Sequence, residues 1–137
     1  MKVNPYLHFR GNCAQAITFY EDVFGIKAEN VVKFSDMPQE AGYKITSGTE
    51  DYITHACLNF GEENALHGIM MSDWTQAEIG TNMSISVAFN NLEEAQVAFD
   101  KLKVGGKVEQ PLAKTFWSEG WGSIVDKFGI QWQITVK

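Results

Sequence analysis

Apolar residues recur at helical spacing in two segments of the chain. In the first segment, the members of the apolar stripe are Ala16, Ile17, Tyr20, Val23 and Phe24. Asn12 precedes this stripe as a favourable helix cap, and Gln15 stands three residues later, as in a capping box. Gly25 follows the stripe and supplies a left-handed stop. The pattern therefore predicts an amphipathic helix between Asn12 and Gly25.

The second segment repeats this arrangement. Asn91 is the predicted cap, Glu94 takes the capping-box position, and Gly105 and Gly106 end the helix. The apolar stripe consists of Leu92, Ala95, Phe99 and Leu102. Four positions of the second segment lie 79 residues after equivalent positions of the first. The pairs are Asn12 and Asn91, Ala16 and Ala95, Tyr20 and Phe99, and Val23 and Leu102. A repeat of this kind indicates duplication of one structural unit.

Short runs rich in apolar and β-branched residues flank both helices and predict strands. They lie at residues 3–10, 27–34, 52–60 and 65–72 in the first half, and at 82–89 and 107–112 in the second. A hairpin follows, with its turn at residues 126–129, since Asp and Gly are favoured at the first and last turn positions. Each half thus contains a strand, a helix and about three more strands. We predict an α+β fold of mostly antiparallel sheet, a single domain of two βαβββ modules at about 1–75 and 80–137.

Residues 35–51 interrupt the alternation with Pro38, Gly42 and Gly48. A loop longer than about 12–15 residues in a compact domain is often a lid or a binding loop. A flexible excursion without a role is the alternative, and the sequence leaves both open.

One face of three predicted strands carries neutral polar groups. Side chains alternate across a strand, so each of these strands has an apolar face and an opposite face. The residues on the opposite faces are His55, Cys57, Asn59, Ser84, Ser86, Gln131, Gln133 and Thr135. A face open to bulk water usually carries Lys and Glu, and these residues include neither. Neutral polar groups suit a concave surface that hydrogen-bonds a small molecule. A solvated face that lacks charges is the alternative.

The stretch from Thr115 to Ile134 holds three of the four tryptophans, Trp117, Trp121 and Trp132. Buried aromatics mostly serve packing, which favours a hydrophobic plug. The alternative is the wall of a pocket, for which Phe116, Trp117 and Trp121 are the candidates.

Composition narrows the function classes. The 137-residue chain is long enough for one domain with its own core. A net charge of −6 argues against nucleic acid, which requires clustered Lys and Arg. There is no apolar run of membrane-spanning length and no apolar signal-peptide core, which predicts a cytoplasmic protein. Cys13 and Cys57 are too few for a disulfide framework and lack metal-ligand spacing.

Four segments of the chain are PYLHFRGNCAQAITFYEDVFG, ITHACLNFG, NMSISVAFNNLEEAQVAFDKLKVGGKVEQPL and TFWSEGWGSIVDKFGIQWQI. Together they resemble PhnB-like proteins of the vicinal oxygen chelate superfamily, which includes glyoxalase I and the bleomycin-resistance and fosfomycin-resistance proteins. Their most specific parts are GNCAQAITFY, GGKVEQPL and TFW followed by DKFGIQW. The resemblance implies two βαβββ modules that each form half of a cup, and a homodimer that some relatives form by exchanging modules. Some members carry a 3-demethylubiquinone methyltransferase label, although no Gly-rich turn after a strand indicates an S-adenosylmethionine site here.

Enzymes of this superfamily bind a divalent metal through four side chains, usually His and Glu. The resemblance places these positions on Pro5, His55, Ser84 and Gln133. Pro5 has no donor side chain, and neutral Ser84 and Gln133 are weak ligands for ions that prefer imidazole, thiolate or carboxylate. We therefore expect no metal site of the superfamily type and no cofactor.

The sequence favours two functions. The first is a small-molecule binding protein whose contacts are His55, Cys57, Ser84, Ser86, Phe116, Trp117, Trp121 and Gln133. The second is a metal-independent enzyme that uses His55 as acid or base, with Cys57 or Ser84 as a partner. A metal-dependent lyase or isomerase like glyoxalase I ranks third. His8 and His67 are interpreted as structural, and Cys13 as a core residue, although a helix N-terminus can activate a thiol.

Overall fold

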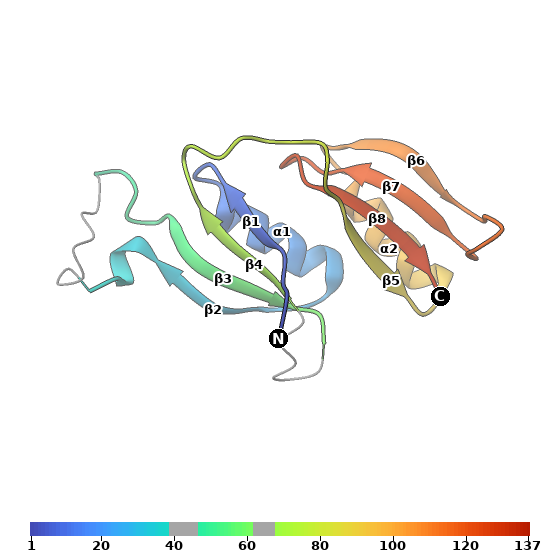
Figure 1. Cartoon of the computed structure of the whole chain (residues 1–137), viewed down its shortest axis with the longest axis horizontal. Helices are drawn as coiled ribbons and strands as arrows, with labels where there is room; N and C mark the ends of the chain where they lie inside the picture. Colours follow the sequence, from blue (N-terminus) through green and yellow to red (C-terminus); the bar gives the residue numbers. More distant parts are fainter. Residues whose placement is uncertain (39–46, 62–67) are drawn as a thin grey trace. The chain divides into compact units, whose positions relative to one another are not determined.

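The chain forms two compact units, Met1–Ala77 and Glu78–Lys137, and the computed structural model describes residues 1–38, 47–61 and 68–137 (Figure 1). The first unit contains β1 (Tyr6–Phe9), α1 (Cys13–Phe24), β2 (Ala28–Lys33), the 3-10 helix η1 (Phe34–Asp36), β3 (Ile53–Asn59) and β4 (Gly68–Asp73). Its sheet has the order β1-β4-β3-β2, in which β1 and β4 are parallel and the other pairs antiparallel.

The second unit repeats this plan. It contains β5 (Ile85–Phe89), α2 (Leu92–Leu102), β6 (Lys107–Ala113), β7 (Trp121–Val125) and β8 (Gln131–Val136). Its sheet has the order β5-β8-β7-β6, again with a parallel pair, β5 and β8, and two antiparallel pairs. The predicted α+β fold of two βαβββ modules is confirmed.

The observed strand boundaries differ most from the predicted ones where the prediction depended on short apolar runs. β1 begins at Tyr6 and β5 at Ile85, each three residues later than predicted. The predicted loop at 35–51 begins with η1, and its central residues 39–46 lie outside the described residues. His67 and most of the connection between the predicted strands at 52–60 and 65–72 also lie outside the described residues.

Each sheet buries one face beneath its helix. α1 packs on β3 and β4, and α2 packs on β5 and β8. The predicted helix stripes supply the buried side, with Ala16, Tyr20, Ala95 and Phe99 all at most 4% exposed. The sheets contribute almost completely buried residues at alternate positions, among them Ala56, Leu58, Trp132 and Ile134. No helix in the described part of the chain is long and apolar enough to cross a membrane.

The start of α1 is stabilised differently from the prediction. Asn12 makes no side-chain capping bond, so the predicted capping box is wrong. The carboxylate of Asp73, at the end of β4, instead accepts hydrogen bonds from the amides of Gly11 (2.8 Å) and Cys13 (3.0 Å) through Oδ1. Its Oδ2 accepts from the amide of Ile53 at 2.9 Å. A residue 60 positions away thus replaces the local cap and connects α1, β3 and β4.

At α2 the predicted cap is confirmed. Asn91 has extended backbone, and its side chain accepts a hydrogen bond from the amide of Glu94 at 2.8 Å. The helix ends at Leu102, earlier than the predicted stop, and Gly105 then adopts a positive φ of 73°.

The predicted hairpin turn is also confirmed. Gly129 has a φ of 85°, and its amide donates to the carbonyl of Asp126 at 2.9 Å. The Asp126 side chain accepts from the amides of Phe128 (2.8 Å) and Ile130 (3.1 Å) through Oδ1. Its Oδ2 accepts from Nε1 of Trp132 at 2.8 Å. The turn is therefore joined directly to the largest buried side chain of the second unit.

Cys13 is the first residue of α1 and is completely buried. Loss of hydration on burial, assisted by the negative charge of Asp73, raises the pKa of its thiol to about 12. These effects exceed the opposite influence of the helix N-terminus. The thiol stays protonated near neutral pH, which supports the interpretation of Cys13 as a core residue.

We predict that Asp73→Asn lowers the free energy of unfolding by about 1.5–3 kcal/mol, the cost of losing a charge-assisted hydrogen bond inside the protein. An amide has one acceptor oxygen, so the amides at Gly11, Cys13 and Ile53 cannot all keep a partner. Urea unfolding followed by circular dichroism measures the change. Asp36→Asn is the matched control, because Asp36 accepts from the exposed amide of Lys33; equal losses in the two variants would contradict the role of Asp73.

A second prediction concerns alkaline pH. The pKa of Cys13 rises on folding from 9.0 to about 12, so the unfolded chain loses this proton first. The contribution of the protonated thiol is complete below pH 9 and declines by about 1.4 kcal/mol per pH unit between that pH and the folded pKa. Cys13→Ala should therefore lose stability less steeply across this window. Urea unfolding at several pH values compares the slopes, and parallel slopes would refute the prediction.

Candidate functional site

Three predicted residues of the second unit form a hydrogen-bonded chain. Gln133, on β8, donates through Nε2 to the hydroxyl of Ser84 at 2.8 Å. Its Oε1 accepts from Nε1 of Trp121, on β7, at 3.2 Å. Ser86 lies beside Gln133 in the parallel register of β5 and β8. Both ends of the amide have partners, so its orientation on this open face of the sheet is determined.

The aromatic stretch divides into a buried part and an exposed part. Trp132 is 1% exposed and belongs to the core, as the plug interpretation predicts. Phe116 and Trp117 are 97% and 58% exposed, which excludes them from the core of their unit. The Trp117 ring meets Trp121 edge to face with centroids 5.9 Å apart, and Phe116 meets Trp117 in the same manner at 4.7 Å. Three aromatic rings therefore continue from the Gln133 amide outward.

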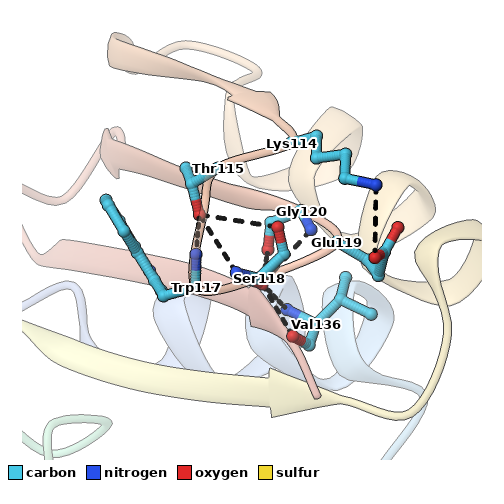
Figure 2. A network of polar contacts seen from close by, with 7 residues as sticks. All are labelled: Lys114, Thr115, Trp117, Ser118, Glu119, Gly120 and Val136. Carbon is cyan, nitrogen blue, oxygen red and sulfur yellow. Dashed lines mark hydrogen bonds and ion pairs between the residues drawn. The ribbon is translucent and has the colours of Figure 1, made fainter.

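Ser118 holds the loop that carries these rings (Figure 2). Its hydroxyl lies 2.7 Å from the carbonyl oxygens of both Gly120 and Val136, and its single proton donates to one or the other. It also accepts from the amides of Gly120 (3.2 Å) and Val136 (3.3 Å) and lies 3.2 Å from the Thr135 hydroxyl. The last residues of β8 and the loop are thereby joined at one oxygen atom.

Thr115 closes the same loop from the other side (Figure 2). Its hydroxyl accepts from the amides of Ser118 at 3.1 Å and Trp117 at 3.4 Å, and its own amide donates to the Ser118 carbonyl at 3.0 Å. Lys114 and Glu119 form an ion pair at 3.4 Å across the loop, but both side chains are exposed. Such a pair contributes little, so the serine and threonine hydroxyls are the main constraint.

The first unit presents a different polar face. In its sheet, His8 of β1 lies beside Ser72 of β4, and continuing the β3–β4 register by one position places His55 of β3 on the other side of Ser72. The next row contains Tyr6, Met70 and Cys57 on the same strands, with Glu29 of β2 beside Cys57. The predicted contacts His55 and Cys57 thus share one face, together with residues that the sequence reasoning did not assign to a site.

Hydroxyl groups contact both imidazoles of this face. The Tyr6 hydroxyl lies 3.3 Å from Nδ1 of His55, and the Ser72 hydroxyl lies 3.1 Å from Nδ1 of His8. The Tyr6 ring stacks on His8 with centroids 5.0 Å apart and lies 6.2 Å from the His55 ring. Trp74 meets His8 edge to face at 5.5 Å and is 53% exposed.

Tyr6 is therefore a direct neighbour of the predicted residue His55, and its contacts continue through His8 to Trp74. Strand alternation already places Tyr6 and His8 on one face of the predicted first strand, and this signal was available in the sequence. Trp74 follows the end of β4, where alternation no longer indicates a direction.

Cys57 is a weak candidate nucleophile. Partial burial, assisted by the negative charge of Glu29, raises the pKa of its thiol. Its Sγ lies against Gly68, where an added Cβ would approach it to 2.8 Å. Because the thiolate is the reactive form, this environment favours a packing role over nucleophilic catalysis.

Six predicted residues lie in the second unit and two in the first. Within the second unit, contacts and register connect Phe116, Trp117, Trp121, Gln133, Ser84 and Ser86. His55 and Cys57 share a face of β3 in the first unit. The expectation that both groups line one hollow remains a prediction.

The repeat shows which residues are equivalent in the two sheets. The amide of Trp74 donates to the carbonyl of Phe9, and the amide of Lys137 donates to that of Phe89. β1 therefore corresponds to β5 with an interval of 80 residues, one more than the interval between the helices. The connection from β1 to α1 has one residue more than that from β5 to α2.

This register bears on the four metal positions implied by the resemblance. In this register Asn4 is equivalent to Ser84, and Met70 is equivalent to Gln133. Pro5 and His55, the other two implied positions, are equivalent to neither of them. Amide, hydroxyl and thioether groups are poor ligands for zinc or similar ions, and the Gln133 amide already has two partners. Among residues 1–38, 47–61 and 68–137, no three His, Cys, Asp or Glu side chains are grouped to hold a metal ion. These positions do not fit the metal of the superfamily's enzymes.

Comparison with known proteins agrees with the fold. Residues 2–134 match the family model described as the Glyoxalase/Bleomycin resistance protein/Dioxygenase superfamily. The chain is 32% identical to Protein YjdN of Escherichia coli (strain K12), over 99% of this chain and 95% of that protein.

Two solved structures are similar along their whole length. Protein PA1353 from Pseudomonas aeruginosa is 31% identical with a TM-score of 0.83, covering 100% of this chain and 98% of that one. The PhnB protein from Bacillus cereus is 25% identical with a TM-score of 0.78, covering 100% of both chains. The predicted resemblance is confirmed, and the chain belongs to the glyoxalase/bleomycin resistance protein/dioxygenase superfamily.

Proposed function

We propose that this protein binds a small organic molecule on the open polar faces of its sheets, with the aromatic loop as a wall. The observation that carries the proposal is the continuous arrangement of Trp117, Trp121, Gln133 and Ser84 in the second unit. Ligand sites combine apolar and aromatic walls with a few polar groups of determined orientation. This face has both.

The rigidity of the loop supports the proposal. Exposing Phe116 and Trp117 to water is unfavourable, and a loop without a role in binding would gain by burying them. Instead, the Ser118 and Thr115 hydroxyls hold the backbone that presents these rings. An aromatic surface that is ordered before the ligand arrives loses less conformational entropy on binding.

The chemistry of the face indicates the type of molecule. Flat rings pack well against indole and phenyl groups, edge to face or offset. Ser84, Ser86 and Gln133 offer neutral hydrogen-bonding groups beside them. We therefore propose a flat, mainly apolar ligand with at least one hydrogen-bonding substituent for the second unit.

A second candidate function is metal-independent acid–base catalysis at His55. It is favoured by the contact between the Tyr6 hydroxyl and Nδ1 of His55, which orients the ring and leaves Nε2 on the open face. The raised pKa of the neighbouring Cys57 thiol favours His55 acting with Tyr6 over a cysteine–histidine pair.

A homodimer in solution forms part of the proposal. Membership of the superfamily supports it, because its members commonly dimerise. The edge strands β2 and β6 also each carry an exposed apolar residue, Val31 at 44% and Val108 at 37%. Exposed edges are places where a second chain can add.

The binding proposal is tested with 2-naphthol, a neutral flat aromatic alcohol. We expect 2-naphthol to shift the indole N–H resonances of Trp117 and Trp121 in a nuclear magnetic resonance titration. Trp117→Ala should weaken binding about 2- to 12-fold, because an aromatic pair contributes about 0.5–1.5 kcal/mol. Ser118→Ala should also weaken binding, since it removes the hydroxyl that orders the loop.

Glu119→Gln is the matched control, because it alters an exposed ion pair in the same loop and leaves both hydroxyls in place. Its affinity for 2-naphthol should equal that of the unmodified protein. If 2-naphthol shifts none of the indole resonances, or if all three variants bind it equally, the aromatic loop is not a ligand wall.

The dimer is tested by light scattering at micromolar concentration, where we expect twice the 15.4 kDa mass of the chain. Substituting Val31 and Val108 separately by Lys should shift the equilibrium towards the monomer if either edge forms the interface. A monomeric mass for the unmodified protein would exclude the dimer.

A further inference from the structure

We propose that the polar face of the first unit recognises the acidic group of a small organic acid through His55 and His8. This inference rests on the proposed function and specifies the ligand class at this face. The observation behind it is that the Tyr6 ring contacts both imidazoles, with its centroid 5.0 Å from that of His8 and 6.2 Å from that of His55. The sequence alone predicts a structural role for His8.

The hydrogen-bond partners of both rings permit a positive charge. Each Nδ1 atom contacts a hydroxyl, that of Tyr6 or that of Ser72. A hydroxyl donates to the neutral ring and accepts from the protonated one, so either state keeps its contact. A carbonyl or carboxylate partner would offer no such reversal, since neither can donate.

The same contacts leave the other nitrogen of each ring available to a ligand. When the hydroxyl donates to Nδ1, the proton of the neutral imidazole resides on Nε2. Neither Nε2 atom has a hydrogen-bond partner among the residues that the structure describes. Each ring therefore offers an N–H donor in its neutral form and a charged donor once protonated. Charge-assisted hydrogen bonds to carboxylate or phosphate oxygens are the strong ones.

Among the residues that the structure describes, few charged or titratable groups lie near the two rings. On β1 they are Tyr6 and His8, with exposed Arg10 after the strand end. β4 contributes only Met70 and Ser72 to this face, and Trp74 follows it. β3 contributes Cys57 beside His55, and exposed Glu29 of β2 lies in the row of Cys57, one row away from the imidazoles.

The organic part of the acid has a surface to contact. Trp74 is 53% exposed and meets His8 edge to face, and Tyr6 is 41% exposed. These rings suit an aromatic or other flat body, and they lie beside the two donors. The combination favours an aromatic acid over a small inorganic anion, which would use only the imidazoles.

The test uses the full chain and three probes that share one ring: benzoate, phenyl phosphate and neutral benzamide. At about pH 5.5, where imidazole is ordinarily protonated, we expect benzoate to bind about tenfold more tightly than benzamide. At about pH 8 the preference should fall below about threefold, because benzoate keeps its charge while imidazole loses its own. Calorimetry gives both affinities, and phenyl phosphate shows whether the site prefers carboxylate or phosphate.

Variants identify the residues. His55→Gln and His8→Gln should each reduce the benzoate preference at the lower pH, and the double variant should abolish it. Tyr6→Phe keeps the stacked ring but removes the hydroxyl, so it should weaken benzoate and leave benzamide unchanged. Lys33→Gln is the control, since it removes a positive charge from the neighbouring strand β2, where Lys33 pairs with Asp51 at 3.6 Å.

The outcomes separate this inference from the proposed function. Equal binding of benzoate and benzamide at the lower pH, or a preference that survives in the double histidine variant, would overturn the acid site while ligand binding stands. If none of the three probes binds and 2-naphthol also fails, both proposals fall. Circular dichroism of each variant confirms that lost preference reflects the site rather than unfolding.

Discussion

Each unit depends on one buried carboxylate that accepts hydrogen bonds from several parts of the chain. In the first unit, Asp73 accepts from the amides that begin α1 and β3, although it lies at the end of β4. In the second, Asp126 accepts from two amides of the hairpin turn and from the indole of Trp132. A carboxylate is suited to this because it only accepts and has two oxygens with several lone pairs. Burying it is tolerable because its hydrogen bonds replace those with water.

Each sheet has a packed face, which its helix covers, and an open face. Between each helix and its sheet, Tyr20, Phe99, Trp132 and their neighbours are buried. The opposite face is left with groups that do not need a helix: imidazole, hydroxyl, amide and thiol. The two open faces then differ in chemistry, because the first carries histidines and the second a glutamine and serines. A duplicated plan has thus acquired two kinds of surface.

The candidate site shows how ordered surface residues are produced without a core around them. Trp117 is more than half exposed, yet its backbone is held by Thr115 and Ser118. The same principle applies to His55, whose ring is oriented by the Tyr6 hydroxyl. Such contacts are local in space and cost little stability, and they position groups where a ligand can reach them. Superfamily membership accounts for the fold. Among the metal positions that the resemblance implies, Ser84 and Gln133 carry neutral groups that are weak ligands for a divalent ion.

Local patterns determined much of the architecture. Helical spacing, the Asn91 cap and the turn at Asp126 each depend on interactions within a few residues, so they could be predicted from the sequence. Alternation likewise separated the buried and open faces of β3, β5 and β8, because it follows from strand geometry alone. The repeat of 79 residues revealed the two βαβββ modules for the same reason.

The tertiary structure decided what depends on partners distant in sequence. Asn12 lost its capping role to Asp73, and Cys13 was made a core thiol by burial and by that same carboxylate. Tyr6 reaches His55 only because β1 and β3 both pair with β4, an order that no local pattern states. The aromatic stretch divided into buried Trp132 and exposed Trp117 because one lies on the helix-covered face and the other on a hydroxyl-held loop. The residue type determines the chemistry that a side chain can perform. The role of that side chain depends on neighbours that are distant in sequence and come together only in the folded protein.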